Sequence, residues 1–209
     1  MAREEMSPIT INGLETHIRF LEGSSNKEIH PLLRAKLVPR EELSTLGDFL
    51  NNRGLKKVFT TGVYDMIHIG HARYLHLAKS LGDVLIVGLN TDDSVRRIKG
   101  PNRPILEERK RAEMLSFITF VDYITPFQED TGAEVIKILR PEAYLCVEGS
   151  WEGDIATKAE VVAVTELGGE IYYTPRQDPF LSTSEIINRI EVSYGQQLLE
   201  QFSHIVRKE

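Results

Sequence analysis

The chain has 209 residues and a formal net charge of −6, from 25 lysine and arginine residues against 31 aspartate and glutamate residues. Hydrophobic residues make up 41% and charged residues 27% of it, so it can bury a core and is not intrinsically disordered as a whole. The acidic balance argues against a nucleic-acid or membrane binder, because both need a basic face. A small phosphorylated ligand needs only a local positive pocket and stays compatible with this charge.

The two ends of the chain show the least pattern. Residues 1–35 are predicted to form an N-terminal appendage, and residues 193–209 a C-terminal helical extension. The extension carries an apolar face that needs a partner, either the chain's own domain or a second subunit, so we expect a homo-oligomer and specifically a dimer. The N-terminus is acidic and leads into no hydrophobic stretch, and no apolar run reaches the ~18 residues of a membrane span, so we expect a cytoplasmic protein.

Helix and strand patterns alternate between these ends. Leu43, Leu46 and Leu50 recur at helical spacing, and Pro39 suits the first turn of that helix. The single cysteine, Cys146, lies in an apolar run and is predicted to be buried. The predicted strands are 58–61, 83–89, 120–124, 143–147 and 170–174. The predicted helices that follow them are 69–81, 106–117, 130–139, 155–167 and 182–193, with a last helical stretch after Gly195.

Strands that alternate with helices across short loops predict a parallel sheet with helices on both faces. We therefore expect residues 36–192 to form an α/β, Rossmann-like, doubly wound sheet of five strands. In such folds the ligand lies beyond the carboxyl ends of the strands. A functional site is therefore expected in the loops after Thr61, Leu89, Ile124, Val147 and Thr174.

Two closely spaced histidines follow the first of these strands. His68 and His71 stand at the start of a predicted helix, where unpaired backbone N–H groups and the helix dipole favour phosphate. Two imidazoles one turn apart can add donors to phosphate oxygens, and Gly70 lets a nucleotide approach the backbone. The spacing and the absence of a nearby cysteine argue against zinc, so no metal-ligating residues are assigned.

The segment Thr61-Gly-Val-Tyr-Asp-Met-Ile-His-Ile-Gly-His71 resembles the signature of the cytidylyltransferase-like nucleotidyltransferases. These enzymes join an NTP to a phosphorylated alcohol or sugar and release pyrophosphate. Three further segments resemble later signatures of the family: Arg97-Ile-Lys-Gly-Pro-Asn-Arg-Pro-Ile105, Phe127-Gln-Glu-Asp-Thr131 and Leu181-Ser-Thr-Ser-Glu-Ile-Ile187. Together they are most similar to the heptose 1-phosphate adenylyltransferase domain. The resemblance spans about residues 36–192.

The resemblance implies a site for an NTP that carries Mg²⁺ and a site for a phosphorylated small molecule. Transfer of a phosphoryl group depends on positioning and on neutralising the charge of its oxygens. The residues expected to act in catalysis are His68, His71, Lys99 and Arg111. The residues expected to bind the nucleotide are Thr61, Gly62, Val63, Tyr64, Gly70, Ser182, Thr183 and Ser184. The residues expected to bind the acceptor are Asp65, which could instead order His71, and Asp92, Arg103, Glu148 and Trp151.

Two segments leave the base and the acceptor open. Glu148 stands where the heptose enzymes typically carry a lysine, and Trp151-Glu-Gly153 looks more like cytidylyltransferases that act on glycerol 3-phosphate or an aminoalcohol phosphate. Those enzymes usually carry Arg-Thr-x-Gly-Ile before the Ser-Thr-Ser element, where this chain has Arg176-Gln-Asp-Pro-Phe-Leu181. ATP and CTP both stay open as the NTP, and a non-catalytic nucleotide sensor is the alternative of a different class.

Overall fold

The computed structural model describes residues 6–11, 14–19, 30–148, 155–178 and 182–206 of the chain. By its internal contacts the chain divides into two units, Met1–Pro31 and Leu32–Glu209. The smaller unit contains a hairpin and the larger unit contains the sheet.

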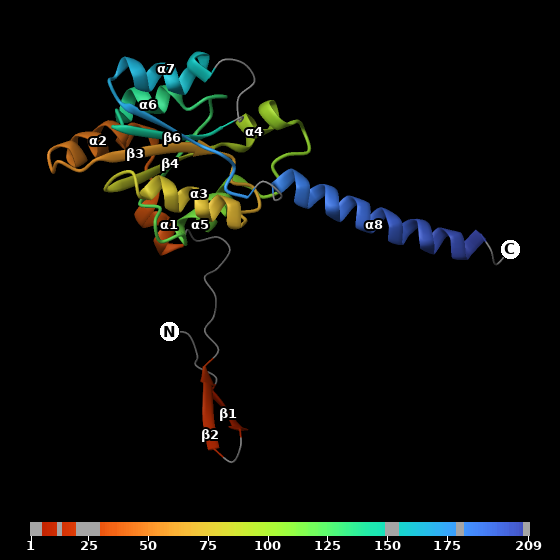
Figure 1. Cartoon of the computed structure of the whole chain (residues 1–209). Helices are drawn as coiled ribbons and strands as arrows, with labels where there is room; N and C mark the ends of the chain where they lie inside the picture. Colours follow the sequence, from red (N-terminus) through yellow and green to blue (C-terminus); the bar gives the residue numbers. More distant parts are fainter. Residues whose placement is uncertain (1–5, 12–13, 20–29, 149–154, 179–181, 207–209) are drawn as a thin grey trace. The chain divides into compact units, whose positions relative to one another are not determined.

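The smaller unit is built on two antiparallel strands, β1 (Met6–Ile11) and β2 (Leu14–Arg19), which are labelled in Figure 1. They pair from Met6 opposite Arg19 to Ile11 opposite Leu14. No strand was predicted in residues 1–35, so this hairpin was missed. Asn12-Gly13 separates the two strands in the sequence, and this dipeptide is typical of a tight two-residue hairpin turn.

The larger unit is built on a five-stranded parallel sheet with the strand order β5–β4–β3–β6–β7. This confirms the predicted Rossmann-like fold class. The central strand β3 comes first in this unit, the chain winds outward from it to β5, and it then returns to the other side of β3 for β6. Winding therefore reverses beside β3, which opens a crevice beyond the carboxyl ends of β3 and β6. The strands are β3 (Lys57–Gly62), β4 (Val84–Asn90), β5 (Tyr123–Phe127), β6 (Ala143–Val147) and β7 (Glu170–Thr174).

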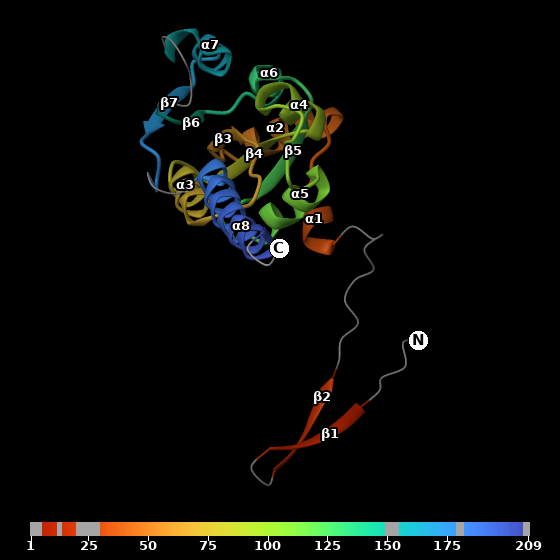
Figure 2. The same cartoon turned by 90° about the vertical axis from the view of Figure 1, so that its right-hand side faces the viewer.

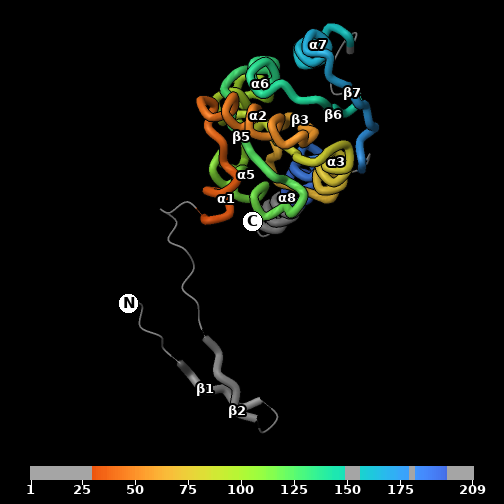
Figure 3. The backbone as a smooth tube through the Cα atoms, turned by 90° about the vertical axis from the view of Figure 1, so that its left-hand side faces the viewer, coloured from red at the N-terminus to blue at the C-terminus, as the bar shows by residue number. Residues whose placement is uncertain are grey.

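Helices cover both faces of this sheet, as Figures 1 and 2 show from two directions. One apolar core includes residues of α1 (Pro31–Lys36), α3 (Ile69–Lys79) and α5 (Glu108–Ser116). The other includes residues of α2 (Leu43–Asn51), α6 (Ala133–Leu139) and α7 (Ala159–Glu166). The remaining elements are η1 (Arg40–Glu42), α4 (Asp92–Lys99), η2 (Ile155–Thr157) and α8 (Thr183–Val206). Figure 3 shows the same two layers from the side opposite to that of Figure 2.

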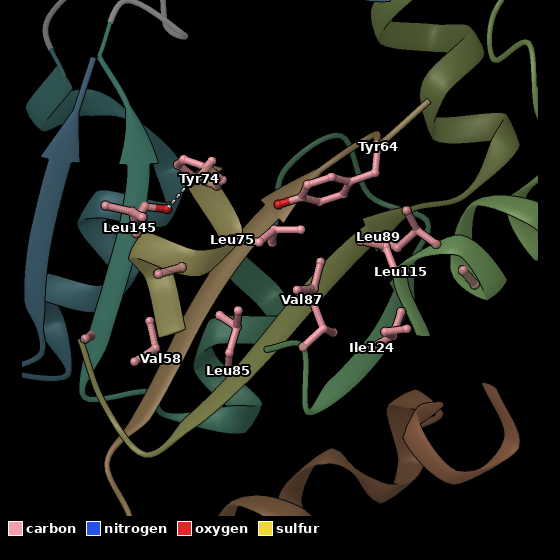
Figure 4. Packing of buried hydrophobic residues seen from close by; sticks show 14 of the residues in the cluster. Val58, Tyr64, Tyr74, Leu75, Leu85, Val87, Leu89, Leu115, Ile124 and Leu145 are labelled. Atoms are coloured by element: carbon pink, nitrogen blue, oxygen red, sulfur yellow. Dashed lines mark hydrogen bonds between the residues drawn. The ribbon is translucent and has the colours of Figure 1, made fainter. Parts of the chain in front are cut away.

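The core under α3 is close-packed, as Figure 4 shows. Val58 and Leu85 from neighbouring strands and Leu75 from α3 have no exposed side-chain surface. Burial of each such side chain stabilises the fold by about 1.5–3 kcal/mol. The Tyr74 hydroxyl donates a hydrogen bond of 2.7 Å to the Leu145 carbonyl and so joins α3 to β6.

Side chains alternate between the two faces along β6. Leu145 and Val147 pack into the core under α3, whereas Tyr144 and Cys146 belong to the core under α6 and α7. Cys146 is only 3% exposed, which confirms the predicted burial of the single cysteine. The alternation places Tyr144 and Cys146 near the carboxyl end of β6, on the face of the sheet that α3 does not cover.

The third strand of the sheet begins later than predicted. The expected strand 120–124 is observed as β5 at Tyr123–Phe127. Asp122 explains the delay, because its carboxylate accepts hydrogen bonds from the Leu85 backbone N–H at 2.7 Å and from Lys79 Nζ at 2.5 Å. The Asp122 side chain thus accepts the bond from the Leu85 N–H of β4, beside the point where the predicted strand would have paired with β4.

Helix α4 is absent from the expected elements, since residues 97–105 resemble a loop and the helix occupies Asp92–Lys99. The Thr91 side chain caps it by accepting from the Ser94 N–H at 3.3 Å. Acids in its first turn and bases in its last turn suit the helix dipole. Val95 and Ile98 are its only apolar residues, too few to reveal a helix in a strongly charged sequence.

Three other helix boundaries differ from the predictions. Helix α6 begins after Gly132 without a side-chain cap, three residues later than the predicted helix 130–139. The predicted helix 155–167 is divided into η2 and α7, with Lys158 between them. Helix α8 runs through Gly195 without a break, whereas two helical segments were expected there. A single glycine weakens a helix by only about 1 kcal/mol and does not have to end it.

Candidate active site

A cavity of about 540 Å³ opens beyond the carboxyl ends of β3 and β6, at the predicted place. A groove of larger volume, about 810 Å³, lies at the opposite, amino-terminal ends of the strands. It is lined by residues for which no role was predicted. The predicted residues that line the cavity are Thr61, Gly62, Val63, Tyr64, Asp65, His68, Gly70, His71, Lys99, Arg103, Ser182, Thr183 and Ser184. The fold thus brings together most of the predicted site residues, which come from three separate segments of the chain.

The loop between β3 and α3 is held in an unusual backbone conformation. Tyr64 and Met66 have φ values of 49° and 53°, in the left-handed region that residues other than glycine rarely adopt. Asp65 lies between them, and its side chain is 1% exposed. Strain of this kind persists only where the surroundings fix the backbone, and it is concentrated at functional sites.

Asp65 supplies that fixation through its carboxylate. The carboxylate accepts hydrogen bonds from the backbone N–H groups of Ile105 and Leu106, at 2.8 and 3.0 Å, and from Arg103 Nε at 3.0 Å. Its backbone carbonyl accepts a bond of 2.5 Å from the Thr183 hydroxyl at the start of α8. Asp65 therefore joins the first loop to the segment after α4 and to α8, and its bonds are made to the protein.

The two histidines stack against each other at the start of α3, with ring centroids 3.9 Å apart. His68 is the N-cap residue, and its Nδ1 accepts a hydrogen bond of 3.2 Å from the Gly70 N–H. A neutral His68 must then carry its proton on Nε2, which is left as a donor. His71 Nδ1 is buried and has no hydrogen-bond partner among the described residues.

The surroundings of the pair favour neutral imidazoles. Burial lowers the pKa of His68, and the Asp178 carboxylate opposes that change. Burial, with the neighbouring His68 ring, lowers the pKa of His71 to about 4, against the opposing effect of Asp65. Both rings are therefore neutral at pH 7 and act as hydrogen-bond donors rather than as fixed positive charges.

Gly70 is required by the packing of this pair. A Cβ atom at Gly70 would lie 3.0–3.1 Å from the His68 ring and 3.4 Å from Cβ of Asp178. Gly70 was predicted to let a nucleotide approach the backbone. The structure shows an additional task, because the absent side chain leaves room for His68 to fold back and cap its own helix.

Arg111 is not placed over the cavity, in contrast to the prediction. Its side chain has no exposed surface, and its guanidinium donates to the carbonyls of Val63, Leu106 and Asn90 at 2.7–3.0 Å. It also donates to the Asp92 carboxylate at 2.7 Å. Arg111 therefore ties together the loops that follow β3 and β4, and Asp92, expected near the acceptor, is one of its partners and does not line the cavity.

The remaining predicted residues divide between the cavity and its surroundings. Lys99 is exposed at the end of α4 and lines the cavity. Ser182 caps α8 by accepting a bond of 3.1 Å from the Glu185 N–H. Glu148 is exposed beyond β6 and is absent from the lining, and Trp151 lies outside the described residues.

Several lining residues were not predicted. Arg176, Gln177 and Asp178 follow β7 and lie beside the two histidines, and the loop after Thr174 was among those expected to matter. On the other side the cavity is lined by Tyr144, Cys146 and Lys158, which we call the lysine wall; His68, Gly70 and His71 form the histidine wall. Strand alternation in 143–147 was the signal that could have placed Tyr144 and Cys146 on a shared face.

A profile of the Cytidylyltransferase-like family matches residues 59–189, from the middle of β3 into α8. The chain belongs to the cytidylyltransferase-like family. The matched segment contains both walls of the cavity. Family membership therefore rests on the same part of the chain that builds the candidate site, and it confirms the resemblance that the motifs indicated.

Curated relatives carry the name bifunctional protein HldE. The relative from Syntrophotalea carbinolica is 40% identical over 164 residues, which cover 78% of this chain and 32% of that protein. The relative from Campylobacter curvus is 44% identical over 174 residues, covering 78% of this chain and 35% of that protein. The chain thus spans about a third of the length of these cytidylyltransferase-like relatives.

A solved structure supports the same fold. The lipopolysaccharide core biosynthesis protein from Thermoplasma volcanium matches with a TM-score of 0.51 at 29% identity, covering 60% of this chain and all of that one. Within the described part of the chain, every helix falls short of the length and apolar character that a membrane span requires.

Proposed function

We propose that this cytidylyltransferase-like protein is a nucleotidyltransferase that transfers NMP from an NTP to a phosphorylated sugar and releases pyrophosphate. The proposed substrates are ATP and heptose 1-phosphate. The observation that carries the proposal is the histidine wall, in which His68 and His71 meet at the N-terminus of α3 inside the cavity. The HldE relatives and the resemblance to heptose 1-phosphate adenylyltransferases support the choice of substrates.

In the proposed reaction, a phosphate oxygen of the acceptor attacks the α-phosphorus of the NTP. A new P–O bond forms, the bond from the α-phosphorus to the bridging oxygen breaks, and pyrophosphate leaves with the electron pair. The protein contributes alignment and charge neutralisation rather than covalent chemistry. His68 Nε2 and the first N–H groups of α3 other than that of Gly70 are donors for the phosphate oxygens, and Lys99 adds positive charge at the cavity edge.

Arg111, Asp92 and Asp65 act in this proposal as positioning residues. Their hydrogen bonds go to backbone groups and to one another, so they hold the three loops around the cavity in place. The hydroxyls of Ser182 and Thr183 likewise cap and anchor α8. The start of α8 is proposed to face the outer phosphates of the NTP.

We propose that Mg²⁺ enters on the phosphates of the NTP, as it does in many phosphoryl-transfer sites. Among the described residues, no group of three or more His, Cys, Asp or Glu side chains is arranged to hold a metal ion. When bound, the ion would neutralise phosphate charge. Removal of divalent ions with EDTA is expected to abolish turnover, and added Mg²⁺ is expected to restore it.

The direct test measures pyrophosphate release from each NTP with a panel of sugar and polyol phosphates. His68→Ala and His71→Ala are each expected to lower kcat by about 10²–10³-fold, the usual cost of losing one donor to the transition state. His76→Ala is the matched control, because His76 is an exposed histidine on the same helix. Turnover by no pair of substrates, or full activity in both variants, would contradict the proposal. Nucleotide binding without turnover would instead favour a sensor.

A second candidate is a CTP-dependent enzyme that acts on glycerol 3-phosphate or an aminoalcohol phosphate. The motif Trp151-Glu-Gly153 and the acid at Glu148 favour it. Thermal-shift measurements with ATP and CTP separate the two candidates, because a ligand stabilises the folded state by RT ln(1 + [L]/Kd). A larger shift with ATP supports the adenylyltransferase, and a larger shift with CTP supports the cytidylyltransferase.

We also propose that the protein is a cytoplasmic homodimer with residues 1–35 as an appendage, 36–192 as the catalytic domain and 193–209 as the dimerising extension. In the sequence of this extension, Leu198, Leu199, Phe202, Ile205 and Val206 recur at helical spacing and form an apolar face that needs a partner. Gel filtration of a chain that ends at Tyr194 tests the assembly. A dimer that persists after this truncation would contradict the role of the extension.

A further inference from the structure

The lysine wall contains a largely buried lysine that the proposed chemistry above does not use. Lys158 lies between η2 and α7, and its side chain is only 9% exposed. It nevertheless lines the cavity, with its Nζ 5.6 Å from the centre of the Tyr144 ring. A lysine ammonium is rarely buried unless it is paired.

Lys158 forms no ion pair with the residues that the structure describes, although about nine-tenths of its surface is buried. Glu160, the acid nearest in the sequence, instead accepts a hydrogen bond of 3.0 Å from the Gly132 N–H. The Tyr144 ring offers only a weak cation–π contact at this distance. The Nζ atom is not among the buried polar atoms that lack a partner, so the ammonium opens onto the cavity and is available to an anionic ligand.

The position of Lys158 in the helix is also unfavourable. It is the N-cap residue of α7 and makes no side-chain capping bond. A cation at a helix N-terminus is repelled by the helix dipole, and N-cap positions normally carry Ser, Thr, Asp or Asn. A residue that breaks local rules without a compensating contact marks a functional site, because the missing contact is supplied by a ligand.

The location of Lys158 indicates which ligand this is. Tyr144 and Cys146, beside it, face the core under α6 and α7, whereas His68 and His71 belong to the start of α3 on the other face of the sheet. Thr61, at the end of β3, lies between the two walls, with its Oγ1 3.4 Å from the Tyr144 hydroxyl. The cavity therefore presents phosphate-binding groups from two opposite sides.

We propose that Lys158 binds the phosphate of the acceptor, while the histidine wall and the start of α8 hold the NTP. This inference rests on the proposed function and identifies a residue that recognises its second substrate. A transfer between two anions has to bring their phosphates together against repulsion. An ammonium on a non-reacting oxygen of the acceptor phosphate offsets that repulsion and leaves another oxygen free to attack the α-phosphorus.

The test measures binding by calorimetry, so it does not depend on turnover. Heptose 1-phosphate and mannose 1-phosphate are the probes, with unphosphorylated mannose as the ligand control. Lys158→Gln is expected to raise the Kd of both phosphates by about 10- to 100-fold, the effect of losing one charge-assisted bond. Its Kd for a non-hydrolysable ATP analogue is expected to stay within about 2-fold of the wild-type value.

Two further variants complete the design. Lys158→Arg keeps the charge and is expected to restore part of the affinity. Lys137→Gln is the matched control, since Lys137 is 53% exposed on α6 and is expected to leave every Kd unchanged. Thermal unfolding of each variant checks that it is folded.

The inference is overturned if Lys158→Gln binds the phosphorylated probes like the wild type, if it loses the ATP analogue equally, or if the wild type binds neither sugar phosphate. Failure of the proposed function has a different signature. If the wild type releases no pyrophosphate but binds sugar phosphates through Lys158, the phosphate site stands and the enzymatic proposal falls.

Discussion

The histidine wall and the lysine wall of the cavity differ in how the sequence encodes them. His68, Gly70 and His71 stand within four consecutive positions, so their pattern is visible in the chain and belongs to a recognisable family signature. Tyr144, Cys146 and Lys158 are spread over 15 positions and meet because β6 and α7 lie side by side in the fold. Site residues that form a contiguous motif can be identified from the sequence. Site residues that are brought together only by the fold can be identified only from the structure.

The largest expected effect concerns Asp65, which supports the histidine wall. Asp65→Ala leaves the N–H groups of Ile105 and Leu106 and the Arg103 guanidinium without their acceptor. We expect the free energy of unfolding to fall by about 3–5 kcal/mol, as measured by urea denaturation, because a buried charge loses its partner. Asp48→Ala, on the exposed surface of α2, is the control and should stay within about 0.5 kcal/mol. Equal effects of the two variants would remove the anchoring role of Asp65.

The next effect is the pH dependence of stability that His71 imposes. Its pKa is lowered from 6.5 to about 4 in the fold, so the folded state favours the neutral ring. The resulting stability is fully present above pH ~6.5 and is lost as the pH falls toward ~4, by about 3 kcal/mol in total. Urea denaturation between pH 4 and 7 measures it. His71→Gln cannot titrate, so its stability should fall less over this range; parallel curves would contradict the assignment.

Gly70→Ala tests the packing of the histidine wall with a smaller change. The added methyl lies 3.0–3.1 Å from the His68 ring, so the ring has to shift by a few tenths of an ångström. We expect kcat to fall about 10-fold, because phosphoryl transfer is sensitive to alignment. The control is Gly195→Ala, where nothing lies within 4 Å and the helix should gain about 0.5–1 kcal/mol. An unchanged kcat in Gly70→Ala would show that the ring tolerates displacement.

The smallest effect is expected at Tyr144 on the lysine wall. Tyr144→Phe removes only a long contact of 3.4 Å with Thr61 Oγ1 and keeps the ring. We expect the free energy of unfolding to change by no more than about 1 kcal/mol and acceptor binding by less than about 3-fold. Calorimetry with mannose 1-phosphate compares this variant with Lys158→Gln. Similar losses in the two variants would show that the wall acts as a unit rather than through its cation.

Apolar runs bounded by glycines predicted the five strands of the sheet. A strand that is buried on both faces has an almost continuously apolar sequence, such as 84–89. Helix α4 escaped prediction because it has only two apolar residues, Val95 and Ile98, and is otherwise stabilised by a cap and by charges at its ends. The N-terminal hairpin was missed, although the dipeptide Asn12-Gly13 is a sequence pattern typical of hairpin turns.

Within the site, the motif residues were predicted and their division of labour was not. Arg111 carries a charge, which suggested contact with phosphate, but it shares a helix face with Ala112 and Leu115, both buried. That periodicity was the signal for an internal position. Lys158 could not be found from sequence, because its significance depends on the absence of a partner, and partners are known only once the chain is folded.

The hydrogen bond between Thr183 and the Asp65 carbonyl joins residues 118 positions apart. During synthesis, the first loop emerges long before α8, so the cavity stays open on one side until after all five strands of the sheet have been made. Contacts of such long range form late, because closing a long loop costs conformational entropy before the contact can stabilise the chain. Binding of nucleotide to a nascent or refolding chain would therefore report that the last helix has docked.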